Sequence, residues 1–434
     1  MKFGRSIGLL AALVSALCIG GLLSVTVTTK SYSESYPAVV CPPTIAGLNS
    51  QISLASKKTQ FQRLQNRTTK TAPVKVLRLP VNKDSLLFNT EGVTPVVWQS
   101  KASSWAGGAI CTGPSTSQWF VGGAADITTK GRLVIVNSGL SDAIVDVQSF
   151  TENGKQPVRT ITVVSKNYIV IPTDSLAPGD KYLTVHVAPR SGRVNAFMID
   201  EQSKGLRSLG GDLVNSASTP TKSLLIPAIP NQIIKNTKTL PHTLRVLSPG
   251  DVDASVTAEV LSADGVFVPV GLTSRTVNAG IVTEFQFTPK ITSTVLAIRI
   301  TSTEPVVAAI KSTVTVSGRK DFVWSTSAPE LVPLTIAISG LTPLVSFAGD
   351  QINVSLDVTM NNGKVVRKTI KGTDIATWRA PDAARSFTIT KVGPDTFAGA
   401  LVSSVNGYGY FPIAPGSLFT KIELPDSNIR VLNP

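Results

Sequence analysis

The residues best suited to acid–base or nucleophilic chemistry are few in this 434-residue chain, which contains two histidines. His186 lies in an alternating stretch, Leu183–Val187, and is predicted to face solvent on a strand. His242 follows Pro241 at the start of another predicted strand. Nucleophilic catalysis needs a nucleophile, a base and an orienting group held together, and no spacing in the chain indicates such a set. We therefore predict no catalytic residues and a protein that is not an enzyme.

Sequence motifs for hydrolysis, phosphate binding and zinc binding are also missing. The chain has no G-x-S-x-G, no G-x-x-x-x-G-K-[ST] and no H-E-x-x-H. Four carboxylates are candidates for a calcium site: Asp126, Asp146, Asp200 and Glu201. No D-x-[DN]-x-[DN]-G loop, the usual sequence pattern of such a site, accompanies them. We predict neither a metal site nor a cofactor.

Aromatic residues near the C-terminus are candidates for stacking on sugar rings. Tyr408 and Tyr410 alternate with glycines, and glycine neighbours favour an exposed or closely approached backbone. Trp378 precedes Arg379 and is a third candidate. The alternative is that these rings fill cores or stabilise sheet faces, as most aromatic side chains do.

An uncharged stretch, Ser6 to Thr29, follows Lys2 and Arg5. At about 1.5 Å per helical residue it is long enough to cross a bilayer. The leading positive charges predict a cytoplasmic N-terminus and an exported remainder. Its length favours a retained anchor. Cleavage as a signal peptide, giving a secreted protein, and lipidation at Cys18 remain alternatives.

Basic residues are concentrated after this stretch, in a chain with a formal net charge of +14. Between residues 57 and 83 there is no acidic residue. Outside a membrane the plausible anionic partners are lipid head groups and envelope polymers, and not nucleic acid. The alternative is a solvated basic tether. The candidate anion-binding residues are Lys57, Lys58, Arg63, Arg67, Lys70, Lys75, Arg78 and Lys83.

Two cysteines lie outside the anchor, Cys41 and Cys111. Disulfides persist in exported chains, and a bridge closing this loop would stabilise the fold by about 4 kcal/mol in the chain-entropy model. A reactive or metal-binding thiol is the alternative, but no histidine or cysteine lies at metal-ligand spacing beside either residue. We predict a Cys41–Cys111 disulfide.

A three-fold repetition is the strongest indication of fold. Short apolar strands end at Gly139, Gly250 and Gly349, and each is followed by an alternating strand. Each alternating strand closes on a hairpin dipeptide, Asn153-Gly154, Asp264-Gly265 or Asn362-Gly363. The spacings between these landmarks are 14, 14 and 13 residues. Ordered landmarks that recur in this way indicate a repeated unit.

The repeated unit predicts an all-β fold of tandem β-sandwiches. A unit of about 100 residues with several alternating strands is typical of immunoglobulin-like or fibronectin-like architecture. The predicted organisation comprises a cytoplasmic tip and transmembrane helix (1–30), a basic stalk with a Trp- and Cys-containing β region (31–114), and three sandwiches (115–221, 222–328 and 329–434).

The chain also resembles a known family. The stretches Trp105–Cys111, Trp119–Gly123 and Gly131–Gly139 resemble an uncharacterised family of actinobacterial exported proteins that is labelled only as a domain of unknown function. The resemblance covers most of residues 5–410. It implies an N-terminal membrane segment, a β-rich ectodomain in an actinobacterial envelope and Cys111 as a disulfide partner. It implies no activity.

These observations predict a non-catalytic, single-pass protein of the cell envelope, anchored in the lipid bilayer through residues 6–29. Its extracellular β-sandwiches would bind or scaffold an anionic envelope polymer or a surface protein. Two alternatives stay open: an extracellular hydrolase or transferase acting on envelope glycans, and an accessory subunit of a membrane complex.

Overall fold

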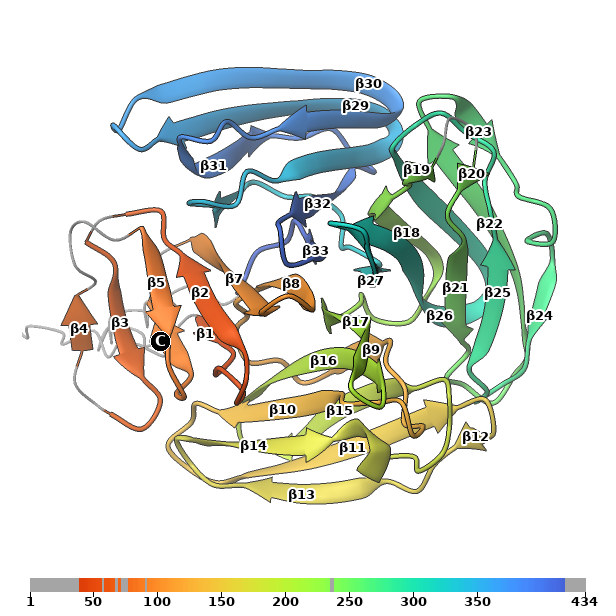
Figure 1. Ribbon diagram of the computed structural model, residues 1–434, viewed down its shortest axis with the longest axis horizontal. Coiled ribbons are helices and arrows are strands. Elements are labelled where there is room, and N and C mark those ends of the chain that lie inside the picture. The colour runs from red at the N-terminus through yellow and green to blue at the C-terminus, as the bar shows by residue number, and fades with distance from the viewer. Residues whose placement is uncertain are drawn as a thin grey trace, which may run out of the picture. The chain divides into compact units, whose positions relative to one another are not determined.

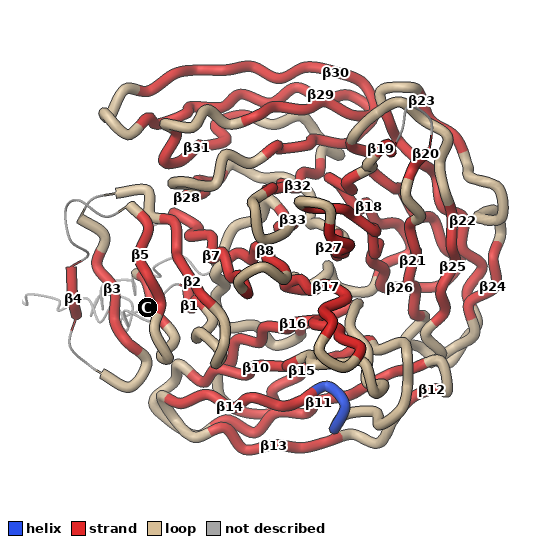
Figure 2. The backbone as a smooth tube through the Cα atoms, viewed as in Figure 1, coloured by secondary structure: helices blue, strands red, loops and turns tan. Residues whose placement is uncertain are grey.

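The computed structural model describes residues 39–56, 58–66, 69–71, 77–89, 92–234 and 238–417. All of them belong to one compact unit, Tyr36–Phe419. They form strands and loops, with a single 3₁₀ turn at Thr173–Ser175 (Figure 2). The prediction of an all-β protein is therefore confirmed. The predicted anchor, residues 6–29, lies outside the described residues, which contain no helix with the length and apolar character that crossing a membrane requires.

The described strands form four copies of one module, and each copy has two sheets with the same order of strands. The first module contains β1 (Val39–Cys41), β2 (Asn49–Ser53), β3 (Gln60–Arg63), β4 (Thr69–Thr71), β5 (Arg78–Val81), β6 (Leu86–Phe88), β7 (Val93–Lys101) and β8 (Trp105–Ile110). The second contains β9 (Gln118–Val121), β10 (Arg132–Asn137), β11 (Ala143–Thr151), β12 (Gly154–Lys155), β13 (Arg159–Val163), β14 (Asn167–Pro172), β15 (Thr184–Ser191), β16 (Val194–Lys204) and β17 (Arg207–Val214).

The third and fourth modules use longer strands. The third contains β18 (Thr221–Pro230), β19 (Ile233–Ile234), β20 (Lys238–Thr239), β21 (His242–Leu247), β22 (Ala254–Ser262), β23 (Gly265–Phe267), β24 (Arg275–Val277), β25 (Thr283–Phe287), β26 (Val295–Val316) and β27 (Arg319–Thr326). The fourth contains β28 (Leu334–Ala337), β29 (Leu344–Met360), β30 (Val365–Arg379), β31 (Ala384–Lys391), β32 (Phe397–Ser403) and β33 (Tyr408–Pro412).

One sheet of each module ends in the closing hairpin of that module, and we call it the hairpin sheet. Its strand order is β5-β2-β7-β8 in the first module and β14-β10-β16-β17 in the second. We call the other sheet of each module the flanking sheet. Its strand order is β1-β6-β3-β4 in the first module and β12-β11-β15-β9 in the second. In the third module β26 belongs to both sheets, and in the fourth β29 and β30 do.

Alternating burial explains why these segments form two packed sheets. Along β22 the side chains of Ala254, Val256, Ala258 and Val260 are buried and the intervening ones are partly exposed. Apolar residues from both sheets of a module form one cluster, which is the core of that module. The predicted hairpin dipeptides are turns, with φ of 105° at Gly154, 119° at Gly265 and 88° at Gly363.

The first module is a copy that the repeat pattern did not include. The sequence predicted three copies and an irregular region before them, whereas β1–β8 reproduce the strand order of the later modules. Strands β3, β4 and β6 have three or four residues each, which is too short for a clear alternation. The strands of the other three modules fall inside the predicted ranges 115–221, 222–328 and 329–434, apart from Thr221. That each of these ranges forms a separate domain stays a prediction.

The four closing hairpins meet at the centre of this unit. Their second strands contact one another in cyclic order, β8 with β17, β17 with β27, β27 with β33 and β33 with β8 (Figure 1). Glycines make this approach possible. A Cβ atom on Gly107 would lie 2.5 Å from Asp212 Oδ1, and one on Gly407 would lie 2.1 Å from the backbone nitrogen of Ala106.

Neighbouring modules also pack through their sheets. The flanking sheet of the first module contacts the hairpin sheet of the second through Leu87 and Phe197. The flanking sheet of the third contacts the hairpin sheet of the fourth through Ala228 and Tyr410. The fourth module returns to the first by parallel pairing of β28 with β7. The modules are therefore joined in a cycle within the described unit.

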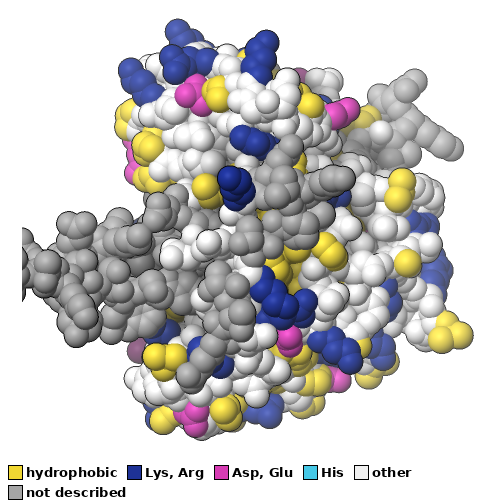
Figure 3. All heavy atoms as spheres, turned by 90° about the vertical axis from the view of Figure 1, so that its left-hand side faces the viewer, with side chains coloured by type: hydrophobic (Ala, Val, Ile, Leu, Met, Phe, Trp, Pro, Cys, Tyr) yellow, Lys and Arg dark blue, Asp and Glu magenta, His cyan; other side chains and the backbone are white. Residues whose placement is uncertain are grey.

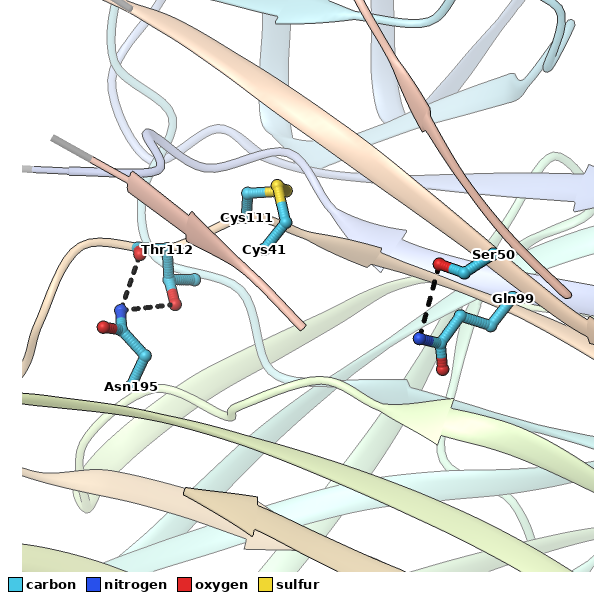
Figure 4. The surroundings of a disulfide bond; sticks show 6 residues. All are labelled: Cys41, Ser50, Gln99, Cys111, Thr112 and Asn195. Carbon is cyan, nitrogen blue, oxygen red and sulfur yellow. Dashed lines mark hydrogen bonds between the residues drawn. A yellow bond between two sulfur atoms is a disulfide. The ribbon is translucent and has the colours of Figure 1, made fainter. Parts of the chain in front are cut away.

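A disulfide joins Cys41 to Cys111, as predicted, and links β1 to the residue after β8 (Figure 4). Both cysteines are fully buried. Nearby, the side-chain amide of Asn195, on β16 of the second module, donates to the carbonyl oxygen of Thr112 at 2.6 Å. The disulfide therefore lies beside a contact between the first two modules.

Candidate binding sites

The most strongly charged exposed element of the fourth module is the start of β30 with the turn before it. From residue 361 to residue 371 there are four basic residues and no acidic one. All four side chains belong to exposed residues: Lys364, Arg367, Lys368 and Lys371. We call this set the basic edge. Figure 3 shows Lys and Arg side chains gathered at the top of one face of the molecule, where β29 and β30 lie.

Strand pairing explains the exposure of the basic edge. Strand β30 pairs with β29 along its length, and no other strand pairs with it among the described residues. Arg367 lies opposite Asp357 and donates to its Oδ1 at 3.0 Å. This hydrogen bond raises the pKa of the Arg367 guanidinium. Lys368 lies opposite Leu356 and so projects from the other face. Lysines at a sheet edge also oppose pairing with another chain, which is the simplest structural role for them.

The basic segment predicted from the sequence is only partly described. Lys57, Arg67 and Lys75 lie outside the described residues. Lys58, Lys70 and Lys83 are exposed. Arg63 lies 3.7 Å from Asp84, the first carboxylate beyond the segment, and Arg78 donates to the carbonyl oxygen of Gly340 at 3.3 Å. Burial lowers the pKa of Arg78. Two of the predicted charges therefore have partners within the protein.

The aromatic residues predicted to stack on sugars lie mainly inside the molecule. Tyr410 is completely buried, and its hydroxyl donates to the carbonyl oxygen of Thr326 at 2.9 Å. Burial raises the pKa of that hydroxyl. A ring enclosed in this way offers no face to a glycan. Tyr408 is half-buried in the same cluster. Trp378 is half-buried with its ring 5.5 Å from that of Phe387, edge to face.

A second candidate site lies on the flanking sheet of the second module. Trp119, His186 and Gln148 are neighbours across β9, β15 and β11. The imidazole of His186 stacks on the indole of Trp119, with ring centres 4.0 Å apart and planes 10° apart. Ser117 Oγ and His186 Nε2 are hydrogen-bonded at 2.8 Å. His186 is half-buried, and this burial lowers its pKa, so the imidazole is neutral at neutral pH.

This part of the sheet lines a hollow with a cavity volume of about 330 Å³, which we call the aromatic hollow. Besides the residues above, its lining includes Asp146, Lys155, Val158, Ala188 and, from the third module, Pro249. The carboxylate of Asp146 accepts from Arg190 Nε at 2.6 Å and from Thr160 Oγ1 at 2.7 Å, and these hydrogen bonds lower its pKa. The hollow therefore combines apolar surface with hydrogen-bonding groups.

The carboxylates that the sequence offered as candidates for a calcium site lie apart from one another in the structure. Asp126 caps the turn at Thr128, and Glu201 pairs with Lys101 at 2.5 Å. Asp200 accepts from the indole nitrogen of Trp324 at 2.8 Å. Across the residues that the structure describes, no three His, Cys, Asp or Glu side chains are grouped so that they could hold a metal ion.

Two buried carboxylates at the centre carried no sequence signal. Asp212 accepts from the backbone nitrogens of Trp324 and Leu213, at 2.7 and 2.8 Å. Asp321 accepts from those of Gly211 and Phe322, at 3.0 and 2.9 Å. Burial raises the pKa of Asp212, and it raises that of Asp321 to about 7. Because they join β17 to β27, these carboxylates hold modules together.

Comparison with known proteins places the chain in a family. A family model described as a family of unknown function, DUF5719, matches residues 97–374, and the chain belongs to this family. No curated protein matches. The expected membership of an uncharacterised family is therefore confirmed.

Two solved structures are similar over different shares of the chain. Thermotoga maritima 1070 is 16% identical, with a TM-score of 0.16, over 25% of this chain and 95% of that one. The tetra-tandem repeat in the extending region of a large adhesion protein is 13% identical, with a TM-score of 0.12, over 88% and 92%. Scores this low carry no structural argument.

Proposed function

We propose that this chain is a non-catalytic protein of an actinobacterial cell envelope that binds an anionic envelope polymer through the basic edge. In this proposal residues 6–29 anchor it in the cell membrane with the N-terminus in the cytoplasm, and the β-modules are extracellular. Each module would be an immunoglobulin-like or fibronectin-like sandwich. The observation that carries the proposal is the set of four exposed basic side chains, three on β30 and one in the turn before it, beside an edge of β30 that no described strand pairs with.

The spacing of these charges suits a polymer. Lys364 and Lys371 are seven residues apart, and at about 3.3 Å per strand residue the charges extend over roughly 23 Å. The side chains project from both faces along this edge, so an extended polymer that follows the edge meets several of them in succession. The arginine has a carboxylate partner, whereas the three lysines keep flexible, hydrated ammonium groups suited to phosphate or carboxylate groups in varied positions. The exposed Lys58, Lys70 and Lys83 would add to the attraction.

A hydrolase or transferase is the alternative, and the hydrogen bond between Ser117 and His186 is the observation that favours it. A serine nucleophile of this kind needs its histidine oriented by a third group. Within the described residues no carboxylate hydrogen-bonds to His186, and the nearby Asp146 is paired with Arg190 and Thr160. The pair therefore supports binding better than catalysis.

The test is a comparison of two triple variants of the full-length chain in a zwitterionic detergent. One variant, K364Q/K368Q/K371Q, removes the lysines of the basic edge. The other, K181Q/K222Q/K290Q, removes three exposed lysines elsewhere. Heparin is the probe polyanion and dextran the neutral control. We expect the first variant to bind heparin about tenfold more weakly than the second at low salt, with a smaller dependence on salt. Equal binding by the two variants would contradict the proposal.

A further inference from the structure

The aromatic hollow lies where the second and third modules separate. The flanking sheet of the second module packs partly on the third module, through Trp119 and Phe150 against Leu247 and Val282. Pro249 of the third module forms part of the wall of the hollow, and the exposed Val158 another part. The sheet face between them is left open, with Ala188 among its lining residues.

Two of the other three junctions of this kind are filled by the protein itself, whereas the junction between the fourth and first modules holds a hollow of about 280 Å³ beside β7 and β28. Between the first and second modules, apolar side chains such as Val40 and Val134 occupy the space. Between the third and fourth modules, Leu225, Leu261, Ala297 and Ala348 form one apolar cluster. The second and third modules leave a cavity of about 330 Å³, which is within the range of sites for small ligands.

The hydrogen-bonding groups in the hollow are positioned before any ligand arrives. The side-chain amide of Gln148 donates to the backbone oxygens of Ser149, at 3.0 Å, and Gln156, which fixes the orientation of its remaining oxygen. The Asp146 carboxylate is held by Arg190 and Thr160. Groups held in this way lose little conformational freedom on binding.

We propose that the aromatic hollow binds one neutral pyranose ring of a glycan. The apolar face of a sugar packs on aromatic surface, which the stacked rings of His186 and Trp119 supply. Gln148 and Asp146 accept from sugar hydroxyls, and the exposed Lys155 donates to one. Of the charged residues that line the hollow, Asp146 is balanced by Arg190 and Lys155 is exposed to solvent, so neither requires a charged ligand. This site is separate from the basic edge and does not depend on it.

An extended peptide fits the hollow less well. Peptides that bind sheets usually add a strand to a free edge. Here β11 pairs with β13 and β15, and β15 pairs with β11 and β9. The strands that carry Asp146, Gln148 and His186 therefore have no free edge, and a ligand must approach their side chains from above the sheet.

The experiment uses the full-length chain in lauryldimethylamine oxide, a detergent without a sugar head group. Isothermal titration calorimetry measures binding of neutral tetrasaccharides of glucose, mannose, galactose and N-acetylglucosamine. Three variants test the hollow: H186A, Q148A and V158W, the last of which fills it from its exposed wall. The matched control is Q351A, because Gln351 is exposed on β29. Melting curves select variants that fold as the wild type does.

We expect at least one tetrasaccharide to bind the wild type, and the three hollow variants to bind it about tenfold or more weakly. Q351A and K364Q/K368Q/K371Q should bind it as the wild type does, with little effect of salt. Failure of all four sugars to bind the wild type would overturn the proposal, and so would unchanged binding by folded hollow variants. Loss of heparin binding without loss of sugar binding would separate this site from the basic edge.

Discussion

The centre of the described unit and the basic edge of β30 are both polar regions of a β-protein, but they differ in what surrounds their charges. At the centre, Asp212 and Asp321 are buried and accept hydrogen bonds from the backbone of neighbouring strands. On β30, the lysines are exposed and one edge of the strand is unpaired among the described residues. Charges at the centre therefore hold modules together, whereas those at the edge are available to a partner.

The largest effect expected from this difference concerns two arginines that each pair with a carboxylate. Arg245 is 3% exposed, and its guanidinium lies 4.7 Å from the ring centre of Trp324 on the central strand β27. It donates twice to Glu284 and also donates to the carbonyl oxygens of Gly123 and Leu183. Arg245→Ala should cost about 3–5 kcal/mol because it takes these hydrogen bonds from two buried carbonyls and a mostly buried carboxylate. Arg367→Ala, at an exposed pair, should cost less than about 1 kcal/mol. Urea unfolding measures both, and equal losses would invalidate the distinction between centre and edge.

Glycines give the next largest contrast. Gly407→Ala puts a methyl group 2.1 Å from the backbone nitrogen of Ala106, so a central strand must shift. We expect a loss of about 2–3 kcal/mol in the free energy of unfolding. The control is Gly250→Ala at an exposed turn with no heavy atom within 4 Å. The control should be neutral or slightly stabilising, and thermal melting of both variants checks this. A tolerated alanine at position 407 would mean that the central strands are not tightly packed.

Asp321 makes the stability of the centre depend on pH. Burial raises its pKa to about 7 in the folded state, from an ordinary value of 3.8. Between these values the folded protein holds a proton that the unfolded chain releases, so this contribution to stability is lost as pH rises from about 4 to 7. Asp321→Asn removes this titrating group and with it this dependence of stability on pH. The stability of the variant relative to the wild type should therefore increase with pH across this window.

Measurement against the wild type is essential here because His242 acts in the opposite direction. Burial lowers the pKa of His242 to about 4, from an ordinary value of 6.5. The contribution of this neutral histidine to the stability of the folded protein is therefore lost as pH falls from about 6.5 to 4. His242 is present in both proteins, and its contribution cancels in the difference. Unfolding in urea at pH 4.5, 5.5, 6.5 and 7.5 gives that difference. A difference independent of pH would show that Asp321 is ionised throughout.

The smallest effect on stability is expected at the basic edge. K364Q/K368Q/K371Q removes three exposed charges that form no salt bridge in the described structure. The free energy of unfolding should change by less than about 0.5 kcal/mol, because exposed substitutions of this kind are nearly neutral. Differential scanning calorimetry tests this. A large drop in melting temperature would assign these lysines a structural role instead.

Much of the fold could be predicted because it depends on local patterns. The turns at Gly154, Gly265 and Gly363 follow from their dipeptides, and the alternating strands before them follow from burial on one face. The Cys41–Cys111 disulfide was predictable because the chain has two cysteines outside residues 6–29. Strand β26, by contrast, contains Pro305, which has no backbone N–H to give to a ladder, and the strand continues because the neighbours of Pro305 pair on both sides of it.

The candidate sites were less predictable because distant residues form them. Ser117 and His186 are 69 residues apart, and no local pattern indicates that they meet. The glycines beside Tyr408 and Tyr410 indicated an exposed or a closely approached backbone, and only the structure shows that the second holds, with the Gly108 backbone nitrogen 2.7 Å from a Cβ added at Gly409. The lysines of the basic edge were visible in the sequence, but only strand pairing shows that β30 has one edge that no described strand occupies.

Lysine footprinting shows which lysines a bound polyanion covers. The full-length chain is acetylated briefly with and without heparin, and mass spectrometry measures the modification of each lysine. Lys364, Lys368 and Lys371 should be protected by heparin, while Lys181, Lys222 and Lys290 should react as before. Equal protection of both groups, or protection of the second group alone, would contradict binding at the basic edge.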